Sequence, residues 1–128
     1  MHPTDPPGME AMAVAALSSL PAKFAEHLAD VVVQVEEFAT TEQLQAVGLT
    51  DRWHLTGLYE GRPLHERSVM DTAEMPPMVS LFRQPLLAEW RETGVRWADL
   101  IRHVVIHEIG HHFGLSDDDM HALEDQAD

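Results

Sequence analysis

The chain has 128 residues, a length that suits one compact domain with a single core. Its 22 acidic and 8 basic residues give a formal charge of -14, so the surface should repel nucleic acid and anionic membranes. Cysteine is absent, which excludes disulfide bonds, thiolate metal ligands and cysteine nucleophiles.

Residues 1–8 contain three prolines and a glycine, and we expect them to be a flexible leader ahead of a single domain over residues 9–128. The apolar run over residues 11–20 is preceded by Asp5 and Glu10 and by no lysine or arginine, which is the wrong charge for a secretory signal. No apolar run approaches the roughly 18 to 20 residues that span a bilayer. We therefore expect a cytoplasmic protein without a membrane partner, and the sequence leaves its oligomeric state open.

The first half of the domain predicts helix, strand and helix in turn. From about residue 9 to residue 29, apolar residues recur at three- and four-residue spacing, which predicts an amphipathic helix that Pro21 kinks or splits. Valines alternate with polar residues over residues 31–38 and predict a strand. Thr40 and Thr41 predict the capped start of a short helix that ends at Gly48.

Two further strands are expected in the middle of the chain. Residues 55–64 have β-leaning side chains broken by two glycines, and they predict a strand that runs into a turn. Residues 78–87 predict another strand, whose far end Pro85 would place at a sheet edge. Residues 86–91 predict a short helical turn that stops near Gly94.

The last third of the chain is expected to carry the chemistry. From Trp97 to Phe113 the apolar residues cover most of the helical circumference, which predicts a largely buried helix. The same segment also carries four histidines and one glutamate, namely His103, His107, Glu108, His111 and His112. Buried ionisable groups are costly unless they are paired or coordinated, so this helix indicates a functional site.

The string HEIGH, residues 107–111, has the spacing of a metal site. His107 and His111 lie roughly 40° apart around a helix and about 6 Å apart along it, so both imidazoles can reach one cation. Glu108 is rotated about 100° from His107, which suits contact with a metal-bound water better than ligation. A nitrogen-rich site with an open position favours one zinc ion.

Asp117 is the expected third ligand, and it requires the chain to turn back. A continued helix would place Asp117 about 9 Å beyond His111 and on another face. Gly114 is placed to end the helix in the left-handed conformation and return Asp117 toward the metal. In an alternative that stays open, Ser116 is the N-cap of a last helix and Asp117 belongs to its first turn.

The full string HEIGHHFGLSD resembles the extended zinc motif of metzincin-like peptidases, in which the last position is more often histidine. More closely, the chain resembles the small bacterial zincin-like metallopeptidases, or minimal zincins. The resemblance covers most of the chain: the first helix, and the segments VVVQVEEF, LTGLYEGRPL, MVSLFRQP and HEIGHHFGLSDDDM. It implies a metalloprotease-like fold, with zinc on His107, His111 and Asp117 and with Glu108 as catalytic base.

We predict an α+β, zincin-like fold, in which a small twisted mixed sheet packs on the active-site helix and the N-terminal helix covers the same layer. His103 is interpreted equally well as a partner of a ligand or as a structural residue, and His112 as a satisfied core or rim residue. His54 and Tyr59 would stabilise an oxyanion if their strand faced the metal.

The expected function is that of a zinc metallopeptidase acting on a peptide or protein substrate. Glu108 would take a proton from the zinc-activated water and pass it to the leaving amine. So short a chain predicts a shallow cleft with weak selectivity for short or flexible peptides. The alternatives are a metal-dependent endonuclease of single-stranded RNA, which the acidic surface opposes, and a non-catalytic zinc-binding interaction module.

Overall fold

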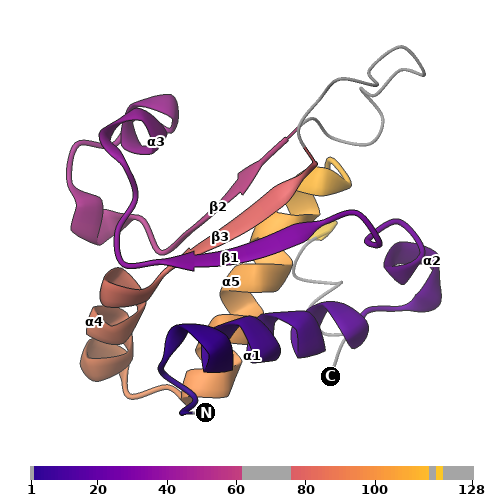
Figure 1. The fold of residues 1–128 in the computed structure, drawn as a ribbon, viewed down its shortest axis with the longest axis horizontal. Helices are drawn as coiled ribbons and strands as arrows, with labels where there is room; N and C mark the ends of the chain where they lie inside the picture. The colour runs from indigo at the N-terminus through magenta and orange to yellow at the C-terminus, as the bar shows by residue number, and fades with distance from the viewer. Residues whose placement is uncertain (1, 62–75, 116–117, 120–128) are drawn as a thin grey trace.

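Three short strands form the sheet on which the candidate site is built, and they lie in the order β1-β3-β2 (Figure 1). Their bounds are β1 Val32–Glu36, β2 Gly57–Glu60 and β3 Met78–Phe82. β3 is central and pairs parallel to β1 and antiparallel to β2. The computed structural model describes residues 2–61, 76–115 and 118–119. In these ranges the sheet is mixed, as the sequence predicted.

The side chains of the sheet alternate between two faces, as strand geometry requires. Val33 and Val35 of β1 pack against the same hydrophobic cluster as the fully buried Leu81 of β3. One position away, Gln34 donates a 2.9 Å side-chain hydrogen bond to the buried Ser80 hydroxyl. The valine alternation therefore puts the apolar face of the sheet towards the core.

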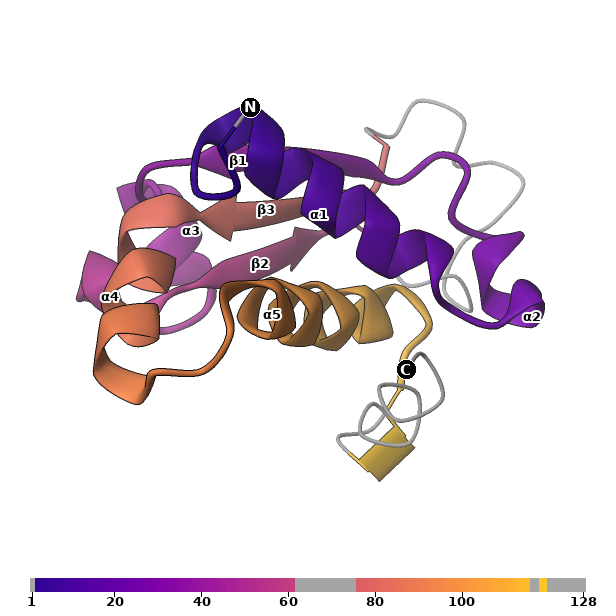
Figure 2. The same ribbon diagram turned by 90° about the horizontal axis from the view of Figure 1, so that it is seen from below.

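Two helices lie side by side on that apolar face (Figure 2). Helix α1, Pro6–Ser18, packs over β1, and helix α5, Trp97–His112, packs over β2 and β3. Met9 and Ala13 of α1 share one buried cluster with Ile101 and Val105 of α5. Burying one such aliphatic side chain contributes roughly 1.5–3 kcal/mol, so the two helices form much of the core. The predicted α+β arrangement, with the N-terminal helix covering the same layer, is confirmed.

Helix α1 begins within the segment that was expected to be a leader. The Asp5 side chain accepts a 2.8 Å hydrogen bond from the Gly8 N–H and caps the helix, which has proline in its first turn. The Pro3 carbonyl also accepts a 2.8 Å bond from the indole of Trp97. The prolines therefore start the helix rather than keep the segment out of it. Pro21 then separates α1 from the short α2, Ala22–Ala25.

Helix α3, Thr41–Ala46, confirms the predicted capped helix. Thr40 accepts a bond from the Gln43 N–H while the Gln43 side chain accepts one from the Thr40 N–H, which forms a capping box. Gly48 follows with a φ of +74°. A short 3₁₀ turn, η1, Arg52–His54, leads from there towards β2.

The prediction of a strand over residues 78–87 was wrong at its far end. β3 stops at Phe82 and is the central strand, and helix α4, Arg83–Thr93, follows immediately. Pro85 lies in the first turn of α4, where its missing N–H costs no helical hydrogen bond. Proline therefore marks a helix start here and not a sheet edge.

The end of α5 has the turn that the sequence indicated. Gly114 has a φ of +68°, its N–H donates to the His111 carbonyl, and the Leu115 N–H donates to the Gly110 carbonyl. These two bonds form a Schellman motif, in which glycine is the usual left-handed residue. Leu115 then packs against the buried cluster of Ile106 and Ile109.

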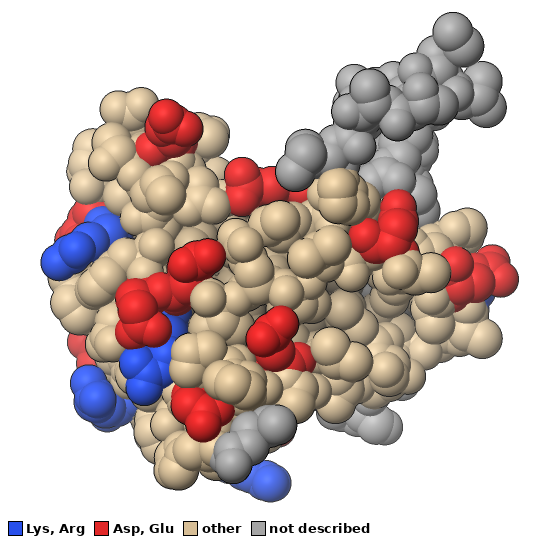
Figure 3. Space-filling view, in the orientation of Figure 1, with Lys and Arg blue, Asp and Glu red and all other residues tan. Residues whose placement is uncertain are grey.

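Acidic side chains are spread across the face of the molecule shown in Figure 3. The described basic residues other than Lys23 lie in η1, in α4, in the turn that follows α4 and in the first turns of α5. None of the helices in the described ranges combines the length and apolar composition that crossing a bilayer requires.

Candidate metal centre

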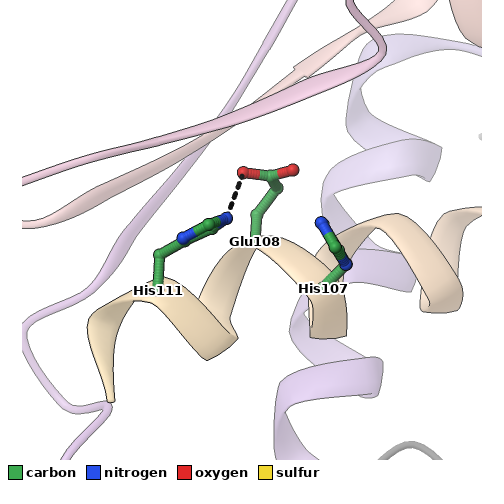
Figure 4. A group of neighbouring side chains, drawn as sticks. All are labelled: His107, Glu108 and His111. Carbon is green, nitrogen blue, oxygen red and sulfur yellow. Dashed lines mark ion pairs between the residues drawn. The ribbon is translucent and has the colours of Figure 1, made fainter. Parts of the chain in front are cut away.

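Three predicted site residues meet on one side of α5. His107, Glu108 and His111 each offer a donor atom, and these atoms lie within 4.8 Å of one another (Figure 4). The two imidazole ring centroids are 5.7 Å apart, and the rings are nearly perpendicular at 86°. Zinc holds an imidazole nitrogen at about 2.0–2.1 Å, so side-chain rotation alone brings both rings to one ion. The donor set therefore fits a zinc ion, as the i, i+4 spacing predicted.

The three side chains differ in their exposure to solvent. The His111 side chain is 52% exposed, whereas that of Glu108 is only 14% exposed. The His111 Nε2 lies 3.9 Å from the Glu108 Oε1, as the dashed line in Figure 4 marks. The site is therefore open to solvent on the His111 side, and its carboxylate is the sheltered member of the group.

Burial changes the acidity of the Glu108 carboxyl. It raises the pKa of Glu108 to about 7, because the charged form loses its hydration, while a backbone hydrogen bond from Tyr59 lowers the pKa and offsets part of that rise. A carboxyl with a pKa near neutrality can both accept and release a proton at physiological pH. This is the property that a general base adjacent to a metal requires.

Strand β2 passes close to Glu108. The Tyr59 N–H donates a 3.1 Å hydrogen bond to the Glu108 Oε1, from a residue 49 positions earlier in the chain. A Cβ added at Gly57 would lie 2.6 Å from the Val104 Cγ1 and 3.4 Å from the Glu108 Cγ. Only glycine at position 57 lets β2 approach α5 at this distance.

A part-buried hydrogen-bond network holds Tyr59 in place. The Tyr59 hydroxyl lies 2.8 Å from the Nδ1 of His112, whose Nε2 lies 3.2 Å from the His27 carbonyl oxygen. A carbonyl only accepts, so Nε2 donates and Nδ1 accepts from the tyrosine hydroxyl. His112 is fully buried and satisfied, as the sequence interpretation held. Since the Tyr59 hydroxyl is bonded to His112, the backbone of Tyr59 and not its hydroxyl faces Glu108.

The structure describes two of the remaining candidate residues, His103 and His54. The His103 ring stacks at 6.2 Å on that of His107, one helical turn earlier. His54 is exposed in η1, and its Nε2 lies 3.5 Å from an Asp51 oxygen. Asp117, the predicted third ligand, lies outside the described residues, so its role stays a prediction.

Sequence reasoning did not find the Tyr59 N–H or the close approach at Gly57. A backbone donor leaves no mark on residue types, so no pattern could have indicated it. Gly57 did interrupt a strand pattern, which is a weak signal that another backbone or helix comes close. The part of the site contributed by β2 therefore becomes visible only in the fold.

Comparison with known protein families also indicates a zinc-binding protein. A search of curated proteins gave no match. A family model described as zincin-like metallopeptidase matches residues 28–127, a range that includes the sheet, α4 and α5. Proteins of this family normally bind zinc, and the His107, Glu108 and His111 group is able to hold a metal ion. On the strength of that match over most of its length, the chain belongs to the zincin-like metallopeptidase family.

Proposed function

We propose that this chain is a zinc-dependent metallopeptidase that acts on short or flexible peptides. One observation carries the proposal: a sheltered carboxylate, Glu108, lies beside two imidazoles whose donor atoms are within 4.8 Å of it and of each other. A structural zinc site is usually closed by four protein ligands and needs no such carboxylate. The half-exposed His111 instead leaves a side of the site open to substrate.

His107 and His111 would hold the ion, with Asp117 as the third ligand by its spacing in the sequence. When bound, zinc supplies a Lewis acid that polarises the peptide carbonyl and lowers the pKa of a coordinated water towards 7.

Glu108 is the proton carrier in the proposed reaction. One carboxylate oxygen accepts the proton of the attacking water, and the same group later gives that proton to the nitrogen of the leaving amine. The pKa of about 7 suits both transfers. The Tyr59 N–H orients the carboxylate, because its 3.1 Å bond fixes one oxygen of Glu108 towards β2.

The edge of β2 is the proposed guide for the peptide. Within the described residues β2 pairs with β3 alone, and the Tyr59 N–H on its other edge faces Glu108. An extended peptide can add to such an edge through main-chain hydrogen bonds. A substrate bound in this way would pass directly over the carboxylate, which favours flexible chains over folded proteins.

The proposal is tested by metal analysis and peptide cleavage. The purified chain should bind about one zinc ion, and a peptide library should be cleaved with zinc but not after treatment with chelator. Glu108→Gln should retain zinc and lose at least about 100-fold in kcat/KM, the usual contribution of general acid–base catalysis. His54→Gln, which removes an exposed imidazole outside α5, is the matched control and should retain activity.

Two outcomes decide against a peptidase. Unchanged hydrolysis in Glu108→Gln with zinc still bound would remove Glu108 from the reaction. A chain that binds zinc and cleaves no peptide would instead favour the non-catalytic binding module. Chelator-sensitive cleavage of single-stranded RNA in the same assay would favour the endonuclease.

A further inference from the structure

A pocket of about 150 Å³ opens beside His107 and Glu108. Its walls come from α4, from α5 and from the residue before β2, and they are formed by Thr56, Glu89, His103, Val104, His107 and Glu108. The volume is roughly that of five waters at about 30 Å³ each. Pockets that enclose drug-sized ligands are larger, at about 300–1,000 Å³. This pocket therefore suits one side chain or chain terminus of a bound substrate.

Two carboxylates line the pocket, and since Glu108 is assigned to the reaction, Glu89 is the one left to bind a charged group. It is half-buried on α4, and across the described ranges its carboxylate has neither an ion pair nor a hydrogen bond. Arg83, on the same helix, is already bonded to Glu37 at 3.0 Å and to the Thr4 carbonyl. A carboxylate in a pocket wall can accept a charge-assisted hydrogen bond from a cation that enters the pocket.

The other walls match the chemical character of a cationic side chain. Val104 offers an apolar wall, and Thr56 and His103 offer polar groups. Lysine and arginine combine an apolar stem with a charged head, so the stem can lie on apolar surface while the head meets a carboxylate. A free α-amino group has the same charge without the stem.

We propose that this pocket binds a cationic group of the substrate next to the cleaved bond, with Glu89 as the specificity-determining residue. The inference rests on the proposed peptidase function and refines it, because it adds a charge preference to the substrate class. The pocket adjoins His107 and Glu108, so a group held there is adjacent to the reacting carbonyl.

The test uses the zinc-loaded full chain and peptides that differ at one position. Each position in turn carries lysine, arginine, glutamine or norleucine, and initial cleavage rates are measured by mass spectrometry. At one position the cationic peptides should be cleaved about tenfold faster than the neutral ones, the ratio expected for one charge-assisted hydrogen bond. Glu89→Gln should bring the rates to within about twofold, and Glu89→Lys should favour glutamate there.

Acetylated peptides distinguish the two sources of the cation. A preference for lysine over glutamine among N-acetylated peptides identifies the side chain. Faster cleavage of neutral peptides with a free N-terminus than of their acetylated forms identifies the α-amino group. Either result supports a cationic pocket. Equal rates in both comparisons in the wild-type chain, or a preference that Glu89→Gln leaves unchanged, would overturn it.

Glu92→Gln is the matched control, because it removes the same charge from an exposed position of the same helix. The Glu92→Gln variant should keep the preference for cationic peptides. If it loses that preference as fully as Glu89→Gln does, the preference comes from the overall charge of the protein and the pocket proposal is overturned. Circular dichroism and zinc content verify that each variant is folded.

The experiments can reject the pocket proposal and the proposed peptidase function independently of each other. If no peptide is cleaved, the proposed function is wrong. The pocket is then tested by measuring how tightly the zinc-loaded Glu108→Gln chain binds the peptides. Tighter binding of lysine than of glutamine peptides, lost on adding Glu89→Gln, supports the pocket; equal affinities overturn it. If peptides are cleaved without a cationic preference, the pocket fails and the function stands.

Discussion

At the scale of single residues, the Glu108 carboxylate is held where its charge is poorly solvated. Its side chain is 14% exposed, and the imidazole 3.9 Å away is itself half exposed. Burial raises the pKa of Glu108 to about 7 from an ordinary value of 4.5. The sheltered position that suits proton transfer therefore costs stability when no cation is bound.

The stability of the metal-free chain should therefore depend on pH through Glu108. Below pH 4.5 the carboxyl is protonated in both the folded and unfolded chain. Between pH 4.5 and about 7 the folded chain keeps a proton that the unfolded chain has released, so the free energy of unfolding falls as the pH rises. At pH 8, metal-free Glu108→Gln should be more stable than wild type by about 3 kcal/mol.

Urea unfolding of both proteins in chelator, at pH 5 and pH 8, measures this difference. The gain from Glu108→Gln should be small at pH 5 and large at pH 8. A gain of equal size at both values would mean that the Glu108 carboxylate is not destabilised by burial.

At the scale of elements, local signals predicted most of the secondary structure. The capping residue Thr40, the alternating valines of β1 and the glycine after α5 act through neighbours in sequence, so they are visible without a fold. The change from β3 to α4 at Phe82 was missed. Residues 78–87 are mostly apolar and few enough to form either a strand or a helix. The pairing of β3 with two other strands is what ends the strand at Phe82.

The close approach of β2 to α5 at the site depends on Gly57. In Gly57→Ala the new Cβ would lie 2.6 Å from the Val104 Cγ1, so β2 must move away from α5. We expect a loss of about 1–3 kcal/mol in the free energy of unfolding. Zinc should still bind, because His107 and His111 both lie on α5, but kcat/KM should fall as the Tyr59 N–H leaves Glu108.

A second substitution tests the cause. Val104→Ala removes the atom that the new Cβ meets, so the double variant Gly57→Ala with Val104→Ala should lose less stability than the sum of the single losses. Unfolding in urea, zinc content and peptide cleavage are measured on all four proteins. Strictly additive losses would mean that the two positions do not contact each other.

At the scale of the whole molecule, the sequence predicted the layers better than the site. Helix amphipathicity and strand alternation indicate which faces are buried, and they predicted two helices on one face of a mixed sheet. His107, Glu108 and His111 were predicted because one helix holds all three. The Tyr59 N–H and Glu89 were not, because they reach α5 from other elements through the tertiary fold.

The net charge of -14 leads to the last prediction, which concerns the rate of substrate encounter. Figure 3 shows acidic side chains spread over one face, and a field of this sign attracts cations and repels polyanions. Peptides that carry lysines far from the cleaved bond should therefore show a kcat/KM that falls several-fold as salt rises. The change should occur between about 0.01 M and about 0.1 M, where the Debye length shortens from about 30 Å to about 10 Å.

Peptides of the same length with glutamine in place of the remote lysines are the control, and their kcat/KM should stay nearly constant over that range. Stopped-flow fluorescence with the zinc-loaded chain gives both series. A salt dependence that is the same for both peptides would reflect an effect of salt on the protein and not on encounter. Because the remote lysines lie outside the pocket at Glu89, this long-range attraction should persist in Glu89→Gln, which separates it from recognition at the site.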